Sequence, residues 1–314
     1  MKNFVGVSEE LKSNIVAEKR DDQKNISFSQ FSVYESCPYR WYLTYAKGYF
    51  LFSASINTIF GTAIHEAIQE YLRILFEVSA KEADKFDILG LFEKSFKQEY
   101  IKELDNNGGV HFSTKKELEE FYEDGVLILD HFRKKRQIHF SNRKQDLLGM
   151  EIPISVPIKE DSDTFLFNGY IDLIYRDKED GTIYIEDLKT STKGWSKYEK
   201  SDETKQAQLL LYKKYFSKQY KFDMSTIVPR FRILKRKLWE NAEFAQSRIQ
   251  LHEPANGTGK VNNAVQRLTV FINDAFDSNG VAKEKSHPKA PSSSNCRFCP
   301  FSNRPDLCDK KVGL

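Results

Sequence analysis

The sequence predicts an α/β fold in which a small sheet carries the chemistry and helices cover it. Two short runs, Phe165 to Tyr175 and Thr182 to Thr190, are dominated by aromatic and β-branched residues, as strands are. The polar segment Arg176 to Gly181 between them predicts a hairpin loop. A third, alternating run opens at Glu151, so three consecutive strands form a meander. Segments whose apolar residues recur at helical spacing precede and follow this meander, which indicates helices packed on a sheet.

The last two strands of this meander carry charged residues in unusual places. Asp172 interrupts an apolar strand, while Asp187 and Lys189 end the next one, where a spacing of two puts both side chains on one face. A carboxylate in an apolar strand is costly unless it is paired or binds a metal, and neighbouring carboxylates repel unless a cation lies between them. Mg²⁺ or Mn²⁺ takes oxygen ligands and would meet both needs. Lys189 would then face a substrate phosphate and its attacking water.

A simpler interpretation of Asp187 and Lys189 is a structural ion pair on a sheet edge. An acidic residue followed two positions later by lysine is common in this chain, and also occurs at Glu10, Asp22 and Glu203. The pair at Asp187 differs from these because it ends an apolar strand, one hairpin after a second carboxylate. Both interpretations stay open at this point.

Two predicted helices supply further candidates for the same site. His65 lies in the first turn of a helix that starts near Phe60, beside its apolar stripe. There it is either a metal ligand or a hydrogen-bonded packing residue. In the helix predicted from Lys205 to Tyr220, Gln208 and Tyr212 are four residues apart and therefore share a face.

The remaining segments suggest how the chain is organised. Residues 1–25 are polar and predict an N-terminal arm, after which Ser29 is a candidate N-cap. Residues 76–145 have a helical pattern that ends in a basic cluster at 133–136. Together with a second cluster at 235–237, these cations are candidates for contacting a nucleic-acid backbone.

Composition narrows the class of protein. Hydrophobic and charged residues make up 40% and 30% of the 314 residues, as expected for a soluble globular protein. The net charge is only +3, so affinity for a polyanion must come from local clusters of cations. The first residues lack the pattern of a secretory signal, and no apolar run reaches membrane-spanning length. We therefore expect a cytoplasmic protein with no membrane partner.

The four cysteines predict a second site. Cys296 and Cys299 are spaced to bind one metal or cluster, and Cys308 offers a third thiolate. Cys37, before a helix-breaking Pro38, is the remaining cysteine of the chain, so four ligands would staple its two ends together. An iron–sulfur cluster, a zinc ion and free thiols all fit this pattern.

In order along the chain, these motifs resemble the PD-(D/E)XK nuclease superfamily. They are most similar to its RecB-like branch with a C-terminal iron–sulfur motif, typified by the AddB nuclease domain and the CRISPR-adaptation exonucleases. The resemblance runs from Ser27 to Cys308 through SFSQFSVYESCPYRWYLTY, GTAIHEAIQ, GYIDLI, IEDLKTS, QLLLY and CRFCPF. Two departures are Ile171, where the superfamily name has proline, and the long gap between Cys299 and Cys308.

The resemblance implies a restriction-endonuclease-like core, a mixed central sheet flanked by helices, with helical N-terminal and insertion segments and a cysteine-stapled C-terminus. It also implies roles for individual residues. The metal ligands would be His65, Asp172, Asp187 and the carbonyl of Leu188, and the catalytic lysine would be Lys189. The other matches are Glu151 as a first-strand acid, Gln208 and Tyr212 as supports of the site, and Cys37, Cys296, Cys299 and Cys308 as ligands of a [4Fe–4S] cluster, with Zn²⁺ as the alternative.

We therefore expect a Mg²⁺- or Mn²⁺-dependent DNA nuclease, acting as an exonuclease on single-stranded DNA or DNA ends in recombination, repair or phage and defence processing. A structure-specific endonuclease, a non-catalytic DNA-binding subunit and an RNA nuclease are the alternatives. The expected layout is an arm at 1–25 and one nuclease domain at 26–314. Within that domain we expect a helical insertion at 76–145, a catalytic sheet at 146–250 and a cysteine segment at 290–314 that closes onto Cys37. A helicase or a recombination or defence protein would be its partner.

Overall fold

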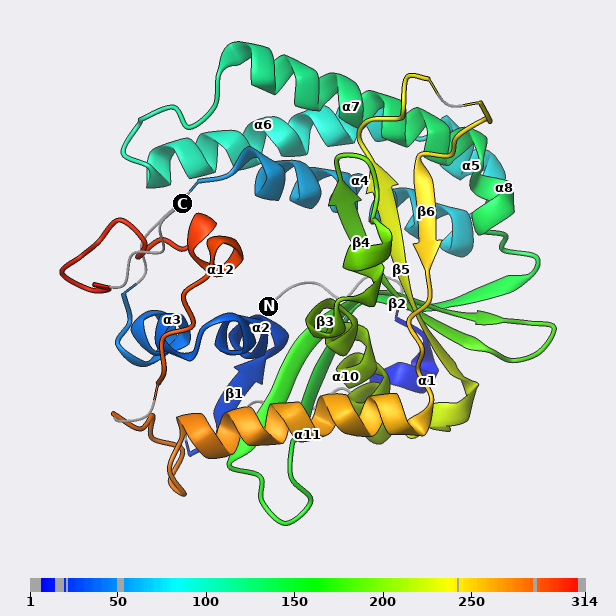
Figure 1. Ribbon diagram of the computed structural model, residues 1–314. Helices are drawn as coiled ribbons and strands as arrows, with labels where there is room; N and C mark the ends of the chain where they lie inside the picture. Colours follow the sequence, from blue (N-terminus) through cyan, green and yellow to red (C-terminus); the bar gives the residue numbers. More distant parts are fainter. Residues whose placement is uncertain are drawn as a thin grey trace.

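A six-stranded mixed sheet forms the centre of the protein and confirms the predicted α/β class (Figure 1). The computed structural model describes residues 7–14, 20, 22–49, 54–241, 243–284 and 287–309. The strands are β1 (Lys24–Ser27), β2 (Gln145–Pro157), β3 (Phe165–Asp177), β4 (Ile183–Ser191), β5 (Ile227–Lys235) and β6 (Ile249–His252). The predicted meander of three strands corresponds to β2, β3 and β4, which pair antiparallel in that order.

Strand β3 lies at the centre of the pairing. It pairs with β2 along one edge, and along its other edge it pairs first with β1 and then with β4. Beyond β4 come β5, parallel to it, and β6, antiparallel to β5. The parallel step from β4 to β5 is made through a helix, as a parallel connection requires.

Helices cover both faces of the sheet (Figure 1). One face packs against the helix that carries His65 and against the helices of the segment 76–145, with Ile64, Leu173 and Leu188 among the buried residues. The other face packs against the remaining long helices, with Phe31, Ile185 and Leu209 in its core. The first group comprises α4 (Ile56–Glu77), α5 (Ala80–Lys85), α6 (Ile88–Asn106), α7 (Lys115–Lys134) and α8 (Arg136–His139), and the second comprises α2 (Phe28–Ser36), α10 (Glu203–Tyr220) and α11 (Thr258–Ala275).

Short elements complete the described chain. They are α1 (Glu9–Lys12), α3 (Pro38–Trp41), a π-helical turn (Tyr42–Ala46), α9 (Lys197–Ser201), a 3₁₀ turn (Met224–Thr226) and α12 (Ser293–Arg297). Among the described residues, no helix combines the length and the apolar character needed to cross a bilayer.

Local chemistry explains where the main helices begin. The side chain of Ser27 accepts a hydrogen bond from the backbone N–H of Gln30, so Ser27 caps α2 and the prediction of Ser29 was wrong by two residues. Ser29 lies inside the helix, because Phe28 already belongs to its first turn. Helix α10 begins in the same way at Asp202, whose carboxylate accepts from two backbone N–H groups.

Candidate functional site

The site forms where β4 separates from β3. The two strands pair from Arg176 with Ile183 up to Leu173 with Glu186, and the next pair in this register would join Asp172 to Asp187. At that point the backbone of Leu188 donates its N–H to Oδ2 of Asp172 at 2.7 Å. The side chain of Asp172 therefore accepts the hydrogen bond from β4 at the point where the backbone pairing of the hairpin ends. Further along the same edge of β3, residues Phe165 to Asn168 pair with β1.

The second neighbour of β3 brings a third carboxylate to the same rung. In β2, Met150 pairs with Leu173 and Ile152 pairs with Ile171, so Glu151 lies opposite Asp172. Glu151 has a φ of 52°, in the left-handed region that a non-glycine residue adopts at a cost. Three adjacent strands thus place Glu151, Asp172 and Asp187 in a row across the sheet.

Close carboxylates disturb each other's ionisation. The pKa of Asp172 is raised well above its usual value, first by burial and then by the negative charge of Asp187, while Lys189 acts in the opposite direction. Glu151 adds to the rise. Asp172 therefore keeps its proton more readily than an exposed aspartate, and a cation between the carboxylates would favour its ionisation.

His65 approaches this row from α4. Its Nδ1 lies 3.7 Å from Oδ2 of Asp172. Burial lowers the pKa of His65, although the charge of Asp187 and a hydrogen bond with the Leu188 backbone favour the protonated form. A neutral imidazole is the form that binds metal ions.

Lys189 lies beside the last carboxylate of the row. Its Nζ is 2.7 Å from Oδ2 of Asp187, and its side chain is 37% exposed, so the ammonium reaches the surface of the site. Burial would lower the pKa of Lys189, but Asp187 and Asp172 outweigh it and raise the pKa. The ammonium therefore stays charged near neutral pH.

Helix α10 supports Asp187 from the other face of the sheet. Gln208 donates from Nε2 to Oδ1 of Asp187 at 2.7 Å. Tyr212, one turn later, is 6% exposed, and burial together with the charge of Asp187 raises the pKa of its hydroxyl. A Cβ at Gly169 would lie 2.9 Å from the Tyr212 ring, so glycine in β3 gives this ring its place.

Gln69 is a residue of the site that sequence reasoning missed. It follows His65 by one helical turn, so the two share a face of α4. Its Nε2 donates to Oε1 of Glu151 at 2.8 Å and lies 3.3 Å from the backbone oxygen of Asp172. The spacing of four from His65 was the one signal that could have identified it.

The comparison with protein families decides what this constellation belongs to. The family model of the PD-(D/E)XK nuclease superfamily matches residues 25–304. The chain belongs to the PD-(D/E)XK nuclease superfamily. Members are metal-dependent nucleases that generally use Mg²⁺ or Mn²⁺, and a nuclease of this kind acts on DNA.

Two other comparisons add little. No curated protein matches the chain. Among solved structures, the crystal structure of SSO0001 is 13% identical and aligns over 97% of this chain and 94% of that one, with a TM-score of 0.37. A TM-score this low supports no argument about the fold or the function.

The carboxylates and the imidazole at the site of this PD-(D/E)XK nuclease are side chains that can bind a hard divalent cation. Oδ2 of Asp187 is buried and lies 2.7 Å from the Lys189 ammonium. A buried acceptor beside two further carboxylates and an imidazole is a suitable donor set for Mg²⁺ or Mn²⁺. As the side chains lie, however, no three His, Cys, Asp or Glu residues of the described chain form a metal cage. The ligand set of His65, Asp172, Asp187 and the Leu188 carbonyl therefore stays a prediction.

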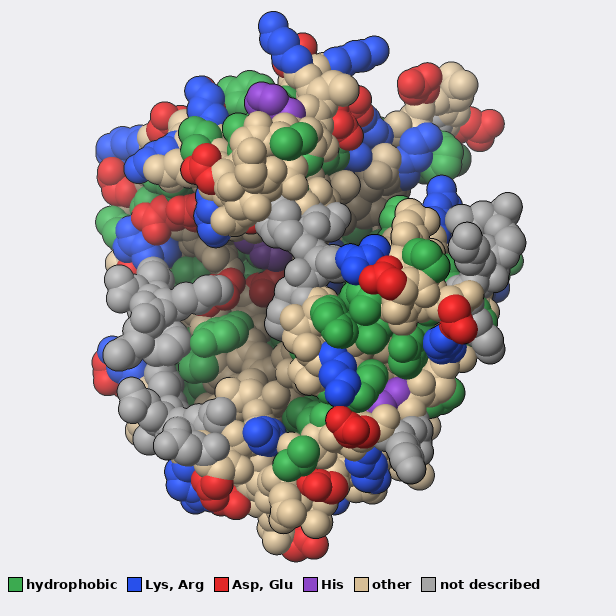
Figure 2. Space-filling view, turned by 90° about the vertical axis from the view of Figure 1, so that its left-hand side faces the viewer, with side chains coloured by type: hydrophobic (Ala, Val, Ile, Leu, Met, Phe, Trp, Pro, Cys, Tyr) green, Lys and Arg blue, Asp and Glu red, His purple; other side chains and the backbone are tan. Residues whose placement is uncertain are grey.

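The face of the molecule shown in Figure 2 is hollowed. Acidic and histidine side chains gather on the floor of the hollow, the two kinds of side chain that the strand-end site combines.

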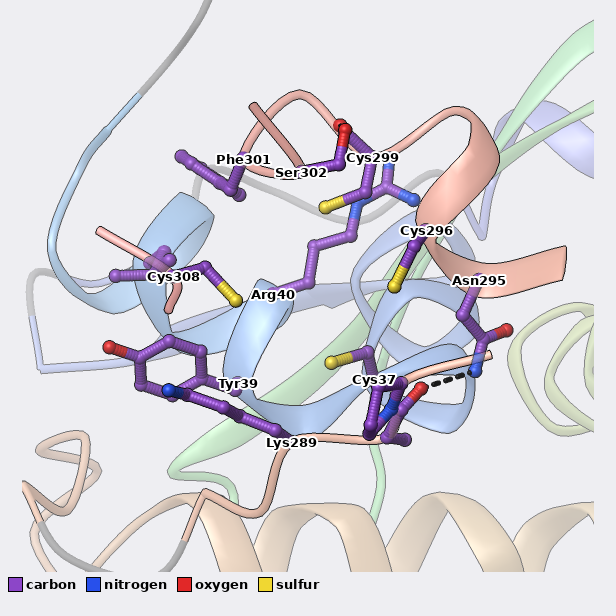
Figure 3. A pocket seen from close by; sticks show the side chains of 13 residues that line it. Cys37, Tyr39, Arg40, Lys289, Asn295, Cys296, Cys299, Phe301, Ser302 and Cys308 are labelled. Carbon is purple, nitrogen blue, oxygen red and sulfur yellow. Dashed lines mark hydrogen bonds between the residues drawn. The ribbon is translucent and has the colours of Figure 1, made fainter. Parts of the chain in front are cut away.

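The cysteines of this nuclease line one pocket (Figure 3). Cys37 lies between α2 and α3, whereas Cys296, Cys299 and Cys308 come from the C-terminal segment, and all four are free thiols. Burial raises the pKa of Cys299, and Cys37 and Cys296 add to this rise while Arg40 opposes it. The four side chains predicted to be ligands thus line one pocket from the two ends of the chain, but as they lie, no three of them in the described chain are close enough to hold a metal ion.

Hydrogen bonds hold the C-terminal segment on the N-terminal helices. Asn295 donates from Nδ2 to the backbone oxygen of Ser36 at 2.7 Å, and the Tyr39 hydroxyl donates to the backbone oxygen of Leu307 at 3.1 Å. The pocket is therefore supported by contacts that do not involve the thiols.

The basic clusters are engaged within the protein. Arg236 and Lys237 both form ion pairs with Asp124 on α7, which is 2% exposed. In the other cluster, Arg133 and Lys134 pair with Asp130. The pairs of Arg236 and Lys237 therefore join the segment after β5 to α7, whereas those of Arg133 and Lys134 lie within α7 itself.

Proposed function

We propose that the protein is a Mg²⁺- or Mn²⁺-dependent deoxyribonuclease that hydrolyses phosphodiester bonds. The observation that carries this proposal is the row of Glu151, Asp172 and Asp187 across three strands, with His65 at one side and Lys189 at the other. A structural ion pair between Asp187 and Lys189 would need none of the other three residues.

Each residue of the site has a role in this proposal. His65, Asp172, Asp187 and the Leu188 carbonyl hold the metal, and Glu151 completes the acidic row. When bound, the metal polarises the scissile phosphate and lowers the pKa of an attacking water. Lys189 orients that water and offsets the charge that develops on the phosphate oxygens. Gln208 fixes the rotamer of Asp187 through the bond to Oδ1, and Tyr212 packs beneath it.

The finer assignment follows from the resemblance of the motifs to the RecB-like branch. On that basis the enzyme is an exonuclease acting on single-stranded DNA or DNA ends. Its setting is recombination, repair or the processing of phage and foreign DNA inside the cell, with a helicase or a recombination or defence protein as partner. The four clustered thiols support a [4Fe–4S] cluster that ties the ends of the chain together.

End-labelled single- and double-stranded DNA tests the catalytic proposal. Wild-type protein is incubated with and without Mn²⁺ beside Lys189→Ala and the control Lys178→Ala, which removes an ion pair with Asp146 at the opposite end of the β3–β4 hairpin. We expect metal-dependent cleavage by the wild type and by Lys178→Ala, and its loss in Lys189→Ala. Cleavage by Lys189→Ala at the wild-type rate would refute the assignment.

The products of the same assay distinguish the alternatives. A ladder that shortens from one end indicates an exonuclease and gives its polarity. Discrete internal cuts at junctions or flaps would indicate a structure-specific endonuclease instead. Binding of DNA without cleavage under any metal condition would indicate a non-catalytic subunit.

The cysteine proposal has its own test. Anaerobically purified protein should be brown, with a broad visible absorption band that disappears in Cys296→Ala. The control Ser302→Ala alters the wall of the same pocket without removing a thiol and should keep the band. A colourless preparation with one equivalent of zinc would replace the cluster by Zn²⁺.

A further inference from the structure

Gln69 contacts two of the three strands that carry the acidic row. Its single Nε2 donates to the Glu151 side chain in β2 and lies within hydrogen-bond distance of the Asp172 backbone oxygen in β3. An amide nitrogen has two hydrogens, so both bonds can form at once. Gln69 and His65 are one turn apart on α4 and share a face of the helix. Through Gln69 this face contacts Glu151, and through His65 it approaches the side chain of Asp172.

The backbone of Glu151 shows why such a contact matters. Within the described chain, the non-glycine residues with positive φ are Glu151 and Lys221. Lys221 is the C-cap of α10, a position where the left-handed conformation is ordinary. Glu151 lies inside a strand, where that conformation has no role in ending an element. Strain of this kind persists only where the surroundings enforce it, and it clusters at functional sites.

We propose that Gln69 is a positioning residue that holds Glu151 in its left-handed conformation, with the carboxylate directed at the metal. This inference rests on the proposed function and deepens it, because it assigns Glu151 to the metal site through Gln69, to which the resemblance gave no role. Gln69 itself presents a donor to Glu151 and takes no part in binding the metal. Contacts of this type outside the ligand shell orient ligands and tune metal affinity.

A direct measurement is Mn²⁺ binding by calorimetry or by electron paramagnetic resonance, in full-length protein carrying Lys189→Ala to prevent turnover. Adding Gln69→Leu should weaken Mn²⁺ binding about 10–100-fold. Gln69→Met keeps the length of the side chain but removes the donor without adding a charge, and should weaken binding as well. If Gln69→Leu does not fold, Gln69→Met supplies the same comparison.

Gln219 provides a matched control on the opposite face of the sheet. It also clamps β2, since its Oε1 accepts from the Ser155 N–H and its Nε2 donates to the Pro153 oxygen. Gln219→Leu should lower the melting temperature while leaving Mn²⁺ affinity at the parent value. A general loosening of β2 would instead weaken binding in both variants and would overturn the proposal.

Exchanging the side chains at positions 69 and 151 tests whether Gln69 orients the carboxylate or only joins α4 to β2. In Gln69→Glu/Glu151→Gln, the amide and carboxylate trade places, so a hydrogen bond between the two positions can form again in the reverse direction. We expect the exchange to restore melting temperature but not Mn²⁺ affinity, because the carboxylate is now on the helix. Restored affinity, or parent affinity in folded Gln69→Leu, would refute the role of Gln69. Absence of Mn²⁺ binding by the Lys189→Ala parent would instead refute the metal site itself, and this inference with it.

Discussion

Glu186 and Asp187 are neighbours on β4, and both are almost fully buried, yet their surroundings differ completely. Glu186 is bound by Arg232 through two hydrogen bonds of 2.7 and 2.9 Å and by the hydroxyl of Tyr175. Burial opposes its ionisation, but the charges of Arg232 and Arg230 and the hydrogen bonds from Arg232 and Tyr175 together outweigh burial, so its pKa is lowered. On the other side of the strand, Asp187 faces further carboxylates, and the pKa of Asp172 is raised.

The contrast shows that this fold can neutralise a buried carboxylate completely. It does so for Glu186 with protein donors alone, one residue away from the acidic row. The crowding of Asp172, Asp187 and Glu151 without such donors is therefore a local property of the strand ends. Natural proteins keep such costly arrangements mainly at functional sites.

The largest effect on stability should come from removing Glu186, the buried carboxylate that Arg232 neutralises. Glu186→Ala leaves Arg232, which is 0% exposed, buried without its partner, and should cost about 3–5 kcal/mol of unfolding free energy. Urea denaturation measures this loss. The double variant Glu186→Ala/Arg232→Met should recover most of it, because an apolar replacement of a buried ion pair is tolerated. If Glu186→Ala alone leaves the free energy of unfolding unchanged, Glu186 does not neutralise Arg232 and the contrast with Asp187 is refuted.

Substitution of Asp187, on the opposite side of the strand, should lower the rate of DNA cleavage more than it lowers stability. Asp187→Asn keeps an acceptor for Gln208 but removes a charge from the row, and cleavage should fall by about 10²–10³-fold. Its stability should stay within about 1 kcal/mol of the wild type, since one of several mutually repelling charges is gone. Rates from single-turnover assays and urea midpoints from the same preparation provide both values. A loss of stability as large as that of Glu186→Ala would make Asp187 a structural residue.

A smaller effect should separate backbone strain from charge at the third acid. Glu151→Gly removes both the carboxylate and the penalty for a φ of 52°, whereas Glu151→Ala removes the carboxylate alone. The glycine variant should therefore be more stable than the alanine variant by about 1 kcal/mol, with metal-dependent cleavage impaired in both. Thermal denaturation of the pair gives the difference. Equal melting temperatures would mean that the left-handed conformation costs nothing.

The smallest effect should appear in the pH dependence of stability, through His139, which lies near Arg232. Burial, followed by the charge of Arg232, lowers the pKa of His139 to about 4. In the unfolded chain this imidazole takes up a proton near pH 6.5, while the folded protein resists protonation. Its contribution is thus present above pH 6.5 and is lost as the pH falls towards 4.

His139→Gln should make the decline in stability over that window shallower. Urea midpoints measured between pH 7 and pH 5 for the two proteins test this expectation. Because the side chain is only half-buried, the difference should be modest. Identical pH profiles would show that neither burial nor the charge of Arg232 lowers the pKa of His139.

The parts of the site that could be predicted are those joined by short loops. Asp172, Asp187 and Lys189 lie on one hairpin, and strand alternation alone puts them at the same end of it. The neutralised side was not foreseen, because Arg232 and Glu186 come from strands whose pairing depends on the parallel crossover through α10. Residue types in sequence give no register between such strands.

The separation of β3 and β4 was beyond sequence reasoning for a related reason. Strand β1 lies in a segment predicted to be mostly an arm, and its four residues carry no pattern distinct from a loop. The same holds for β6, which has four residues. The left-handed Glu151 gave no signal either, since glutamate is not a residue that typically adopts positive φ. Only contacts over long sequence distances produce these features.

The two partners that share one edge of β3 also imply an order of events during folding. Residues Leu173 to Arg176 pair with a strand that follows within one hairpin, whereas Phe165 to Asn168 await a strand about 140 residues upstream. Local pairing closes a small loop and forms faster than pairing over a long separation. In pulse-labelling hydrogen exchange, the amides of β4 should become protected before those of β1. The two aspartates would then meet early, and the chain would assemble the rest of the enzyme around them.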